Sequence, residues 1–232
     1  IARALIAVVI CGGAIVAYFT STPTTPTPAP NPVAVADLTG LTTKVPYRGL
    51  AIQVSTGYQP VETYGPLLDE IADLGANCVL LSVAGYMEHA QSQSIYIDRR
   101  KVPSAEDFAR LIGHARERGL KVVLMPIVLL RNPRGNDWRG VIKPPNWDAW
   151  WNEYEQFVLF FADIARDCHA DALIVGSELI STETQEARWR HVISRCREYF
   201  HDGLLGYSAN WDHYRVVKFW DALDFIGMTS YY

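Results

Sequence analysis

Cys78-Val-Leu-Leu-Ser-Val83 and Lys121-Val-Val-Leu-Met-Pro-Ile-Val128 decide the fold, because these two apolar runs enclose an amphipathic segment. That segment begins at Ser104, a predicted helix N-cap, and ends at Gly119, and its apolar residues recur at helical spacing. A strand, a helix and a second strand in this order predict a parallel pair joined by a right-handed crossover. Pro126 predicts that the second strand ends or bulges at that position.

The same alternation extends from Tyr47 to the end of the chain. Four further strands are predicted at Gly49–Val54, Ala172–Gly176, Leu204–Ser208 and Asp224–Thr229. Three further helices are predicted at Tyr64–Leu74, Trp147–Cys168 and Thr184–Phe200. The strands are continuous apolar runs, which is typical of a parallel sheet buried on both faces.

Both a doubly wound sheet and an eightfold barrel fit this pattern. No Gly-rich loop follows a predicted strand, so the nucleotide-binding doubly wound fold is the less favoured alternative. The chain begins at Ile1 and stops at an apolar strand, so we expect a fragment. We therefore predict an α/β fold, a (β/α)8 TIM barrel truncated after about strand 6.

The N-terminal part has a different composition and predicts two further units. Ala4 to Phe19 is an apolar run without charge and follows Arg3, so we expect residues 1–20 to be a transmembrane helix or signal-anchor. A cleaved signal peptide is the alternative. Residues 21–45 are a Thr/Pro-rich linker that favours extended polyproline II, and residues 46–232 are the barrel domain. The positive-inside rule then places the barrel outside the cytoplasm.

Composition excludes several classes of function. The 232 residues carry 21 basic and 25 acidic side chains, a net charge of −4, and no basic block, so a nucleic-acid partner is not expected. The four cysteines form no C-x-x-C pair. We expect buried free thiols at Cys78 and Cys168, and neither a disulfide framework nor a zinc site. The histidines show no metal-ligand spacing, and His213 alone follows a strand in a position to enter a cleft.

In a barrel of this type, the active site forms at the carboxyl ends of the strands. Glu178 comes directly after the run Leu173-Ile-Val-Gly-Ser177, which places a carboxylate at the rim of a partly apolar cavity. That position suits a general acid. The alternative is a glutamate that caps the next helix or pairs with an arginine.

Tryptophans near the same end suit the binding of sugar rings, whose apolar faces stack on indole. Trp138 and Trp211 are the strongest candidates, because each lies in a loop after a strand. Trp150 and Trp151 begin a long helix, so we expect them to pack against the barrel instead.

Four stretches together resemble a known family. They are Trp138-Arg-Gly-Val-Ile142 with Trp147 to Tyr154, Ala170-Asp-Ala-Leu-Ile-Val-Gly-Ser-Glu-Leu179, Gly206-Tyr-Ser-Ala-Asn-Trp-Asp212, and Phe219-Trp-Asp-Ala-Leu-Asp-Phe-Ile-Gly-Met-Thr-Ser-Tyr-Tyr232. In their order they resemble clan A glycoside hydrolases, most closely family 113, the β-mannanase type. The resemblance covers about Tyr47 to Tyr232.

The resemblance implies roles for individual residues. Glu178 is the general acid/base of a retaining mechanism, and the nucleophile is a second glutamate beyond residue 232. Tyr231 hydrogen-bonds the nucleophile, Asn210 and Trp211 line the glycone subsite, and Trp138 stacks a neighbouring sugar. Much of the clan has Asn before the acid/base. Here that residue is Ser177, which is shorter and puts the contact with the sugar 2-hydroxyl, and hence the sugar preference, in doubt.

These observations predict a membrane-anchored retaining glycoside hydrolase that cleaves a β-linked polysaccharide, with β-mannan as the first guess and internal cleavage expected. No metal or organic cofactor is implied. The alternative is a non-catalytic glycan-binding barrel at the cell surface, which would use the same aromatic residues without a carboxylate pair. A metal-dependent hydrolase is not favoured, because the sequence has no His/Asp ligand set at the predicted strand ends.

Overall fold

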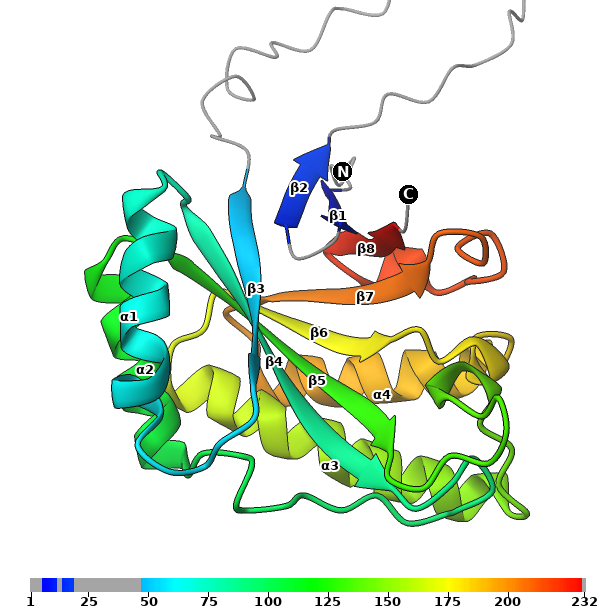
Figure 1. The fold of residues 1–232 in the computed structure, drawn as a ribbon. Helices are drawn as coiled ribbons and strands as arrows, with labels where there is room; N and C mark the ends of the chain where they lie inside the picture. The colour runs from blue at the N-terminus through cyan, green and yellow to red at the C-terminus, as the bar shows by residue number, and fades with distance from the viewer. Residues whose placement is uncertain (1–5, 12–13, 19–46, 231–232) are drawn as a thin grey trace, which may run out of the picture.

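Six parallel strands form the frame of the molecule in a computed structural model that describes residues 6–11, 14–18 and 47–230 (Figure 1). Each strand is hydrogen-bonded to the next along the chain. The strands are β3 (Arg48–Val54), β4 (Cys78–Met87), β5 (Lys121–Leu130), β6 (Ala172–Ser177), β7 (Leu204–Asn210) and β8 (Phe225–Ser230).

Four α-helices connect these strands and cover their outer face. They are α1 (Pro60–Asp73), α2 (Ala105–Glu117), α3 (Trp147–Asp167) and α4 (Glu186–Tyr199). Short 3₁₀ turns lie at Arg139–Val141, Ile180–Thr182 and Trp220–Ala222. Helix α1 lies beside α2, and α3 lies beside α4 (Figure 1). These six parallel strands and the helices between them match the predicted (β/α)8 barrel truncated after about strand 6.

An antiparallel hairpin completes the ring of strands. Its strands are β1 (Ile6–Cys11) and β2 (Ala14–Tyr18). Strand β1 pairs parallel with β8 and β2 pairs antiparallel with β3, so the eight strands close a barrel. The sequence predicts a transmembrane helix or signal-anchor over residues 1–20, whereas the described residues of this segment form strands, for which Ile and Val have a high propensity. In the described part of the chain, no helix combines the length and the apolar character needed to cross a bilayer. The predicted linker, residues 21–45, lies outside the described residues.

The six predicted strands and four predicted helices are confirmed, most of them with ends shifted by a few residues. The predicted N-cap is also confirmed, because the Ser104 hydroxyl accepts a hydrogen bond from the Asp107 amide at 3.1 Å. The prediction that β5 ends or bulges at Pro126 is wrong, since β5 continues to Leu130. Pairing of β5 with β6 stops at Leu124, so on that side the missing N–H of the proline breaks no ladder bond.

The core has two layers. A small cluster fills the barrel interior, and it consists of Leu80, Met125, Ala172, Ile174 and Phe225. A larger cluster lies between the strands and the helices, and includes Trp150 and Trp189, both fully buried. Since side chains alternate along a strand, residues two and four positions beyond the interior cluster also face inward, at the carboxyl end of the barrel.

Candidate active site

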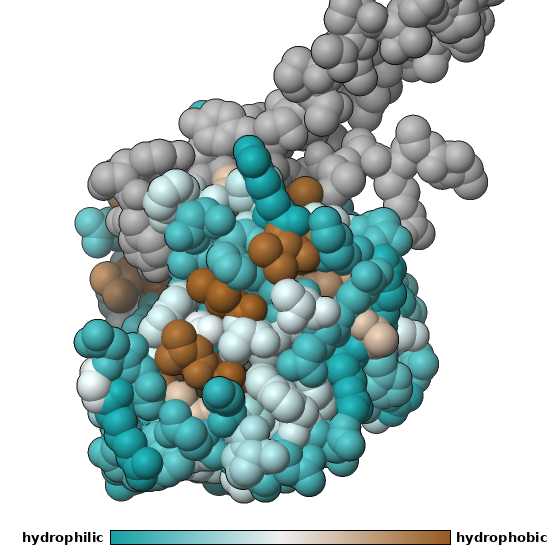
Figure 2. Space-filling model, turned by 90° about the vertical axis from the view of Figure 1, so that its right-hand side faces the viewer, coloured by the Kyte–Doolittle hydropathy of each residue, from teal (hydrophilic) through white to brown (hydrophobic). Residues whose placement is uncertain are grey.

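The carboxyl ends of β4 to β7 lie toward the right-hand side of the molecule in Figure 1. Figure 2 views the molecule from this side and shows patches of hydrophobic side chains set among polar ones. Alternation from the interior cluster places Ser82 of β4, Ser208 of β7 and Thr229 of β8 inside the barrel near this end. All three are buried hydroxyl side chains, so the interior changes from apolar to polar toward the strand ends.

Glu178 occupies the turn that directly follows β6, the fourth of the parallel strands. Its backbone lies in the left-handed region, with φ 52°, which costs a non-glycine residue roughly 1–2 kcal/mol. The Glu178 amide donates to the Ser208 carbonyl oxygen of β7 at 2.8 Å. Side-chain exposure is 3%, so the turn points the carboxyl group into the protein.

Two side chains from distant parts of the chain hold the Glu178 carboxyl group. The Arg139 guanidinium donates to Oε2 and the Thr229 hydroxyl donates to Oε1. Arg139 also donates through Nε to the Ser177 carbonyl oxygen at 3.2 Å. The arginine pairing that sequence analysis left open for Glu178 is therefore present. The same carboxylate is nevertheless at a strand end, where a barrel binds substrate.

The other predicted site residues of β6 and β7 lie close to this carboxylate. Ser177 is buried at the end of β6 and pairs in register with Ser208 of β7. Asn210 ends β7 and pairs in register with Thr229, the residue that donates to Glu178. Trp211 follows it, is 52% exposed, and donates its amide to the Thr229 carbonyl oxygen at 3.1 Å. The structure thus brings Ser177, Asn210 and Trp211 to one edge of the barrel.

Trp138 is connected to the Glu178 carboxylate by Arg139, the next residue in the sequence. It directly precedes the 3₁₀ turn that carries Arg139, whose guanidinium carbon is 5.9 Å from the Trp138 ring centroid. The partly buried indole packs on Gly140, where an added Cβ would be 2.3 Å from the ring. Tyr231 lies outside the described residues, so its hydrogen bond to the nucleophile stays a prediction. Trp150 and Trp151 are buried core residues as expected.

Arg139 and Thr229, which contact the Glu178 carboxyl group, are not among the site residues predicted from the sequence. Arg139 lies within a stretch that carried the family resemblance, but nothing in that stretch distinguishes it from a surface arginine. Thr229 is 51 residues from Glu178 and lies on the same strand as several apolar residues. Alternation within β8 could have placed Thr229 inside the barrel, because it is four residues after the interior residue Phe225.

A second buried carboxylate, Glu183, lies five residues after Glu178 and was also missed. Its side chain is 0% exposed. The Tyr207 hydroxyl donates to Oε1 at 2.8 Å, and His213 Nδ1 lies 3.0 Å from Oε2. Burial raises the pKa of Glu183, the hydrogen bonds from His213 and Tyr207 lower it, and the charge of Asp212 raises it again, with a net upward shift.

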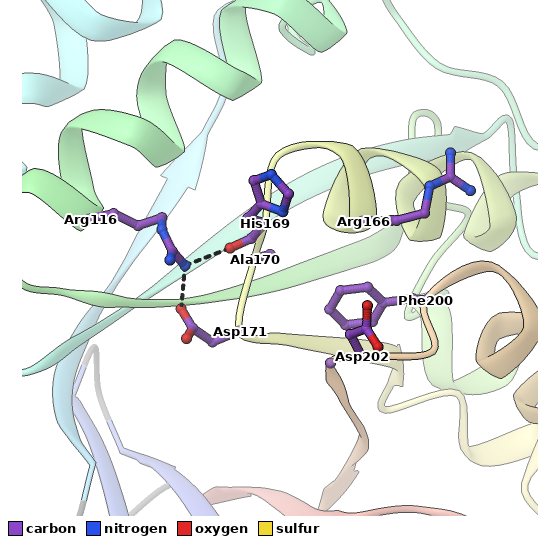
Figure 3. Close-up of a pocket in the computed structure, with 8 residues that line it drawn as sticks. Arg116, Arg166, His169, Ala170, Asp171, Phe200 and Asp202 are labelled. Atoms are coloured by element: carbon purple, nitrogen blue, oxygen red, sulfur yellow. Dashed lines mark hydrogen bonds and ion pairs between the residues drawn. The ribbon is translucent and has the colours of Figure 1, made fainter.

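The opposite end of the barrel has a pocket of about 260 Å³, shown in Figure 3. Arg116 and Arg166 line it, and Arg116 donates to the His169 carbonyl oxygen at 2.7 Å and lies 3.5 Å from the Asp171 carboxylate. Asp171 precedes β6, so this pocket lies at the amino end of the strands, away from Glu178. Within the described residues, no three His, Cys, Asp or Glu side chains are grouped so that they could hold a metal ion.

The parallel strands with a buried carboxylate directly after the fourth of them define a clan A glycoside hydrolase barrel. Comparison with known families agrees, since the profile of Glycoside Hydrolase Family 113 matches residues 54–232. The chain belongs to this family. No curated protein matches the chain.

Solved structures of the same family are similar to this chain. One β-1,4-mannanase, determined as a complex, is 28% identical with a TM-score of 0.72, and the match covers 79% of this chain and 62% of that one. The β-mannanase AaManA from Alicyclobacillus acidocaldarius, in complex with ManMIm, is 31% identical with a TM-score of 0.68, covering 78% of this chain and 59% of that one. The chain therefore spans about 60% of the length of these relatives.

Proposed function

We propose that this protein is a retaining glycoside hydrolase that cleaves internal bonds of β-1,4-linked mannan, with Glu178 as its general acid/base. The observation that carries the proposal is the position of Glu178, a buried carboxylate held by Arg139 and Thr229 after the fourth parallel strand. The solved family members that resemble this chain are β-mannanases, which supports mannan as the substrate.

In this mechanism Glu178 acts twice. It first protonates the glycosidic oxygen of the leaving sugar while a nucleophilic carboxylate attacks the anomeric carbon. It then removes a proton from the water that hydrolyses the glycosyl-enzyme intermediate. We propose that the nucleophile is a glutamate of a further barrel strand after Tyr232. The glycosidic oxygen has to come within hydrogen-bond distance of the Glu178 carboxyl, so it replaces one of the groups that now contact its oxygens.

Replacing Glu178 separates acid/base catalysis from every other role of this residue. The protein should be expressed from its complete reading frame, with wild type, Glu178→Gln and Glu178→Ala compared on β-1,4-mannan. We expect both variants to lose about 10²–10⁴-fold in kcat, the usual contribution of general acid–base catalysis. An aryl mannoside with a good leaving group needs no proton from the enzyme, so Glu178→Ala should cleave it and accumulate the intermediate. Added azide should then restore turnover, because it attacks without a general base.

Glu88→Gln is the matched control. Glu88 is an exposed carboxylate that follows β4 at the same end of the barrel and contacts Asn132, so its loss should leave kcat unchanged. Hydrolysis of mannan by Glu178→Gln at the wild-type rate would refute the proposed role. A wild-type protein that binds mannan without turnover would instead support the glycan-binding alternative.

We also propose that residues 1–20 attach the enzyme to a membrane, with the barrel outside the cytoplasm. The support is compositional, namely a charge-free apolar run followed by a proline-rich segment. Deleting residues 4–19 tests this proposal. If the segment is an anchor, the deleted protein should move from the membrane fraction to the soluble fraction and keep its folding transition. If the segment instead serves as β1 and β2 of the barrel, deletion should abolish that transition.

A further inference from the structure

The turn that presents Glu178 needs external support, because a left-handed non-glycine residue persists only where surrounding contacts fix it. One such contact comes from the side chain of Tyr207. The backbone amide of Leu179, the residue directly after Glu178, donates to the Tyr207 hydroxyl oxygen at 3.1 Å. Tyr207 lies on β7 and is fully buried, so its hydroxyl group has no access to bulk water.

The Tyr207 hydroxyl has a second partner that fixes its direction. It donates its single proton to Glu183 Oε1 at 2.8 Å, so its lone pairs point toward the Leu179 amide. Burial raises the pKa of Tyr207 well above its usual value, so the phenol keeps this proton. Its ring is held by an edge contact with Trp189, with 4.9 Å between ring centroids.

Glu183 extends the chain of hydrogen bonds to the substrate side of the barrel. Its second carboxyl oxygen lies 3.0 Å from His213 Nδ1. His213 follows the predicted sugar-binding residues Asn210 and Trp211, and its backbone amide donates to the Asn210 carbonyl oxygen at 2.9 Å. The side chain of His213 is 36% exposed, so the chain begins at the surface and ends at the backbone beside Glu178.

We propose that His213, Glu183 and Tyr207 form a positioning relay that fixes the turn carrying Glu178 and couples it to the loop carrying Asn210 and Trp211. The inference rests on the proposed function and deepens it. The relay meets the turn at the Leu179 amide, the backbone group directly after Glu178, so it acts on catalysis through the position of the backbone. An error of about 1 Å in such a position can cost on the order of 10²-fold in rate.

Tyr207→Phe is the first test, because it removes one hydroxyl group and keeps the aromatic ring. We expect kcat on mannan to fall about tenfold or more while KM changes by less than about twofold, since misplaced acid/base catalysis affects the chemical step. Tyr154→Phe is the matched control. Tyr154 is also fully buried beside Trp189, but its hydroxyl donates to the Val175 carbonyl oxygen of β6 at 2.7 Å, whereas the Leu179 amide donates to the Tyr207 hydroxyl. Its kcat should stay within about twofold of wild type.

His213 offers a conservative rescue. His213→Ala removes the donor to Glu183, whereas His213→Asn keeps an N–H donor near the position of Nδ1. We expect His213→Ala to lower kcat and His213→Asn to recover most of the loss. If both variants lower kcat equally, or if neither changes it, the relay does not extend to His213 and the proposal is refuted at that residue.

Hydrogen exchange provides a readout that does not depend on activity. Amides of residues 177–183 should exchange faster in Tyr207→Phe than in Tyr154→Phe, with equal exchange in the distant helix α1. Loss of the relay and loss of the proposed function are thereby distinguished. If Glu178→Gln is inactive but Tyr207→Phe has the wild-type kcat and exchange pattern, the relay is refuted and the function stands. If the wild type cleaves no mannan, the function fails, and the exchange comparison alone decides the relay.

Discussion

Gly176, two residues before Glu178, packs closely against three buried aromatic side chains. A Cβ at Gly176 would lie 2.6 Å from the Trp189 ring, 2.8 Å from the Tyr154 hydroxyl oxygen and 2.9 Å from the Tyr207 ring. An ordinary contact of a Cβ is 3.4–4 Å, so each of these groups would have to move by several tenths of an ångström. Gly176→Ala should therefore destabilise the protein.

The magnitude follows from how tightly these neighbours are held. Trp189 is fully buried and stacks on Phe219 with ring centroids 5.2 Å apart, so its indole cannot move into solvent. Overpacking of this kind costs typically 1–3 kcal/mol. Displacing the Tyr154 hydroxyl from its carbonyl acceptor costs about 1 kcal/mol more, and the lower entropy of the unfolded chain offsets about 0.4–1 kcal/mol. The net loss is about 1–3 kcal/mol.

Urea unfolding measures this loss against a matched control. With a denaturant slope of about 2 kcal/mol/M, the Gly176→Ala midpoint should fall by about 0.5–1.5 M. Gly113 lies within helix α2, and a Cβ there would meet nothing within 4 Å. Gly113→Ala should therefore stabilise the protein by about 0.5–1 kcal/mol through helix propensity. A Gly176→Ala midpoint at or above that of wild type would refute the packing argument.

Three further predictions concern capping, titration and thiol reactivity. Ser104→Ala should cost about 1 kcal/mol in urea unfolding, because the first turn of α2 loses its side-chain cap, and an unchanged midpoint would show that water replaces it. The folded state raises the pKa of Glu183 above its unfolded value, so the protonated form contributes stability that is lost as pH rises from about 4.5 through the raised pKa. In urea unfolding, the stability of wild type relative to Glu183→Gln should therefore decrease over this pH range. A constant or increasing difference would contradict the prediction. Burial raises the pKa of Cys78 and Cys168 to about 11 and that of Cys196 to about 12. Alkylation at pH 8, resolved by peptide, should therefore modify these thiols only after unfolding, and labelling of the native protein would disprove their burial.

The sequence predicts the strand and helix order well because each element carries its own local pattern. The strands are continuous apolar runs and the helices have apolar residues at helical spacing, so neither prediction needs knowledge of a distant contact. Pro126 is the instructive failure. A proline interrupts a strand only where a neighbouring strand would need a hydrogen bond from the N–H that proline lacks. Here the pairing of β5 with β6 stops at Leu124, before Pro126. That partner comes from another part of the chain, so no local rule could have supplied the answer.

The N-terminal run shows a different limit. Ala4 to Phe19 is apolar enough for a membrane helix by composition, and it also contains the Ile and Val residues that favour strands. Composition alone does not separate these two outcomes, because both bury apolar side chains. In the structure, β1 of this run pairs with β8 and β2 pairs with β3.

The position of Glu178 at a strand end was predictable because it directly follows a buried strand, and the ends of parallel strands meet at one edge of a barrel. Its partners were not, since Arg139 precedes it by 39 residues and Thr229 follows it by 51. The strain of the left-handed backbone at Glu178 explains why the site needs so many distant contacts. A carboxylate on a flexible loop could orient itself, whereas this one is held in a costly conformation by Ser208 through its amide and by Tyr207 through the next one. Substitution of residues remote from Glu178 in the sequence should therefore alter its chemistry as strongly as changes in the motif around it.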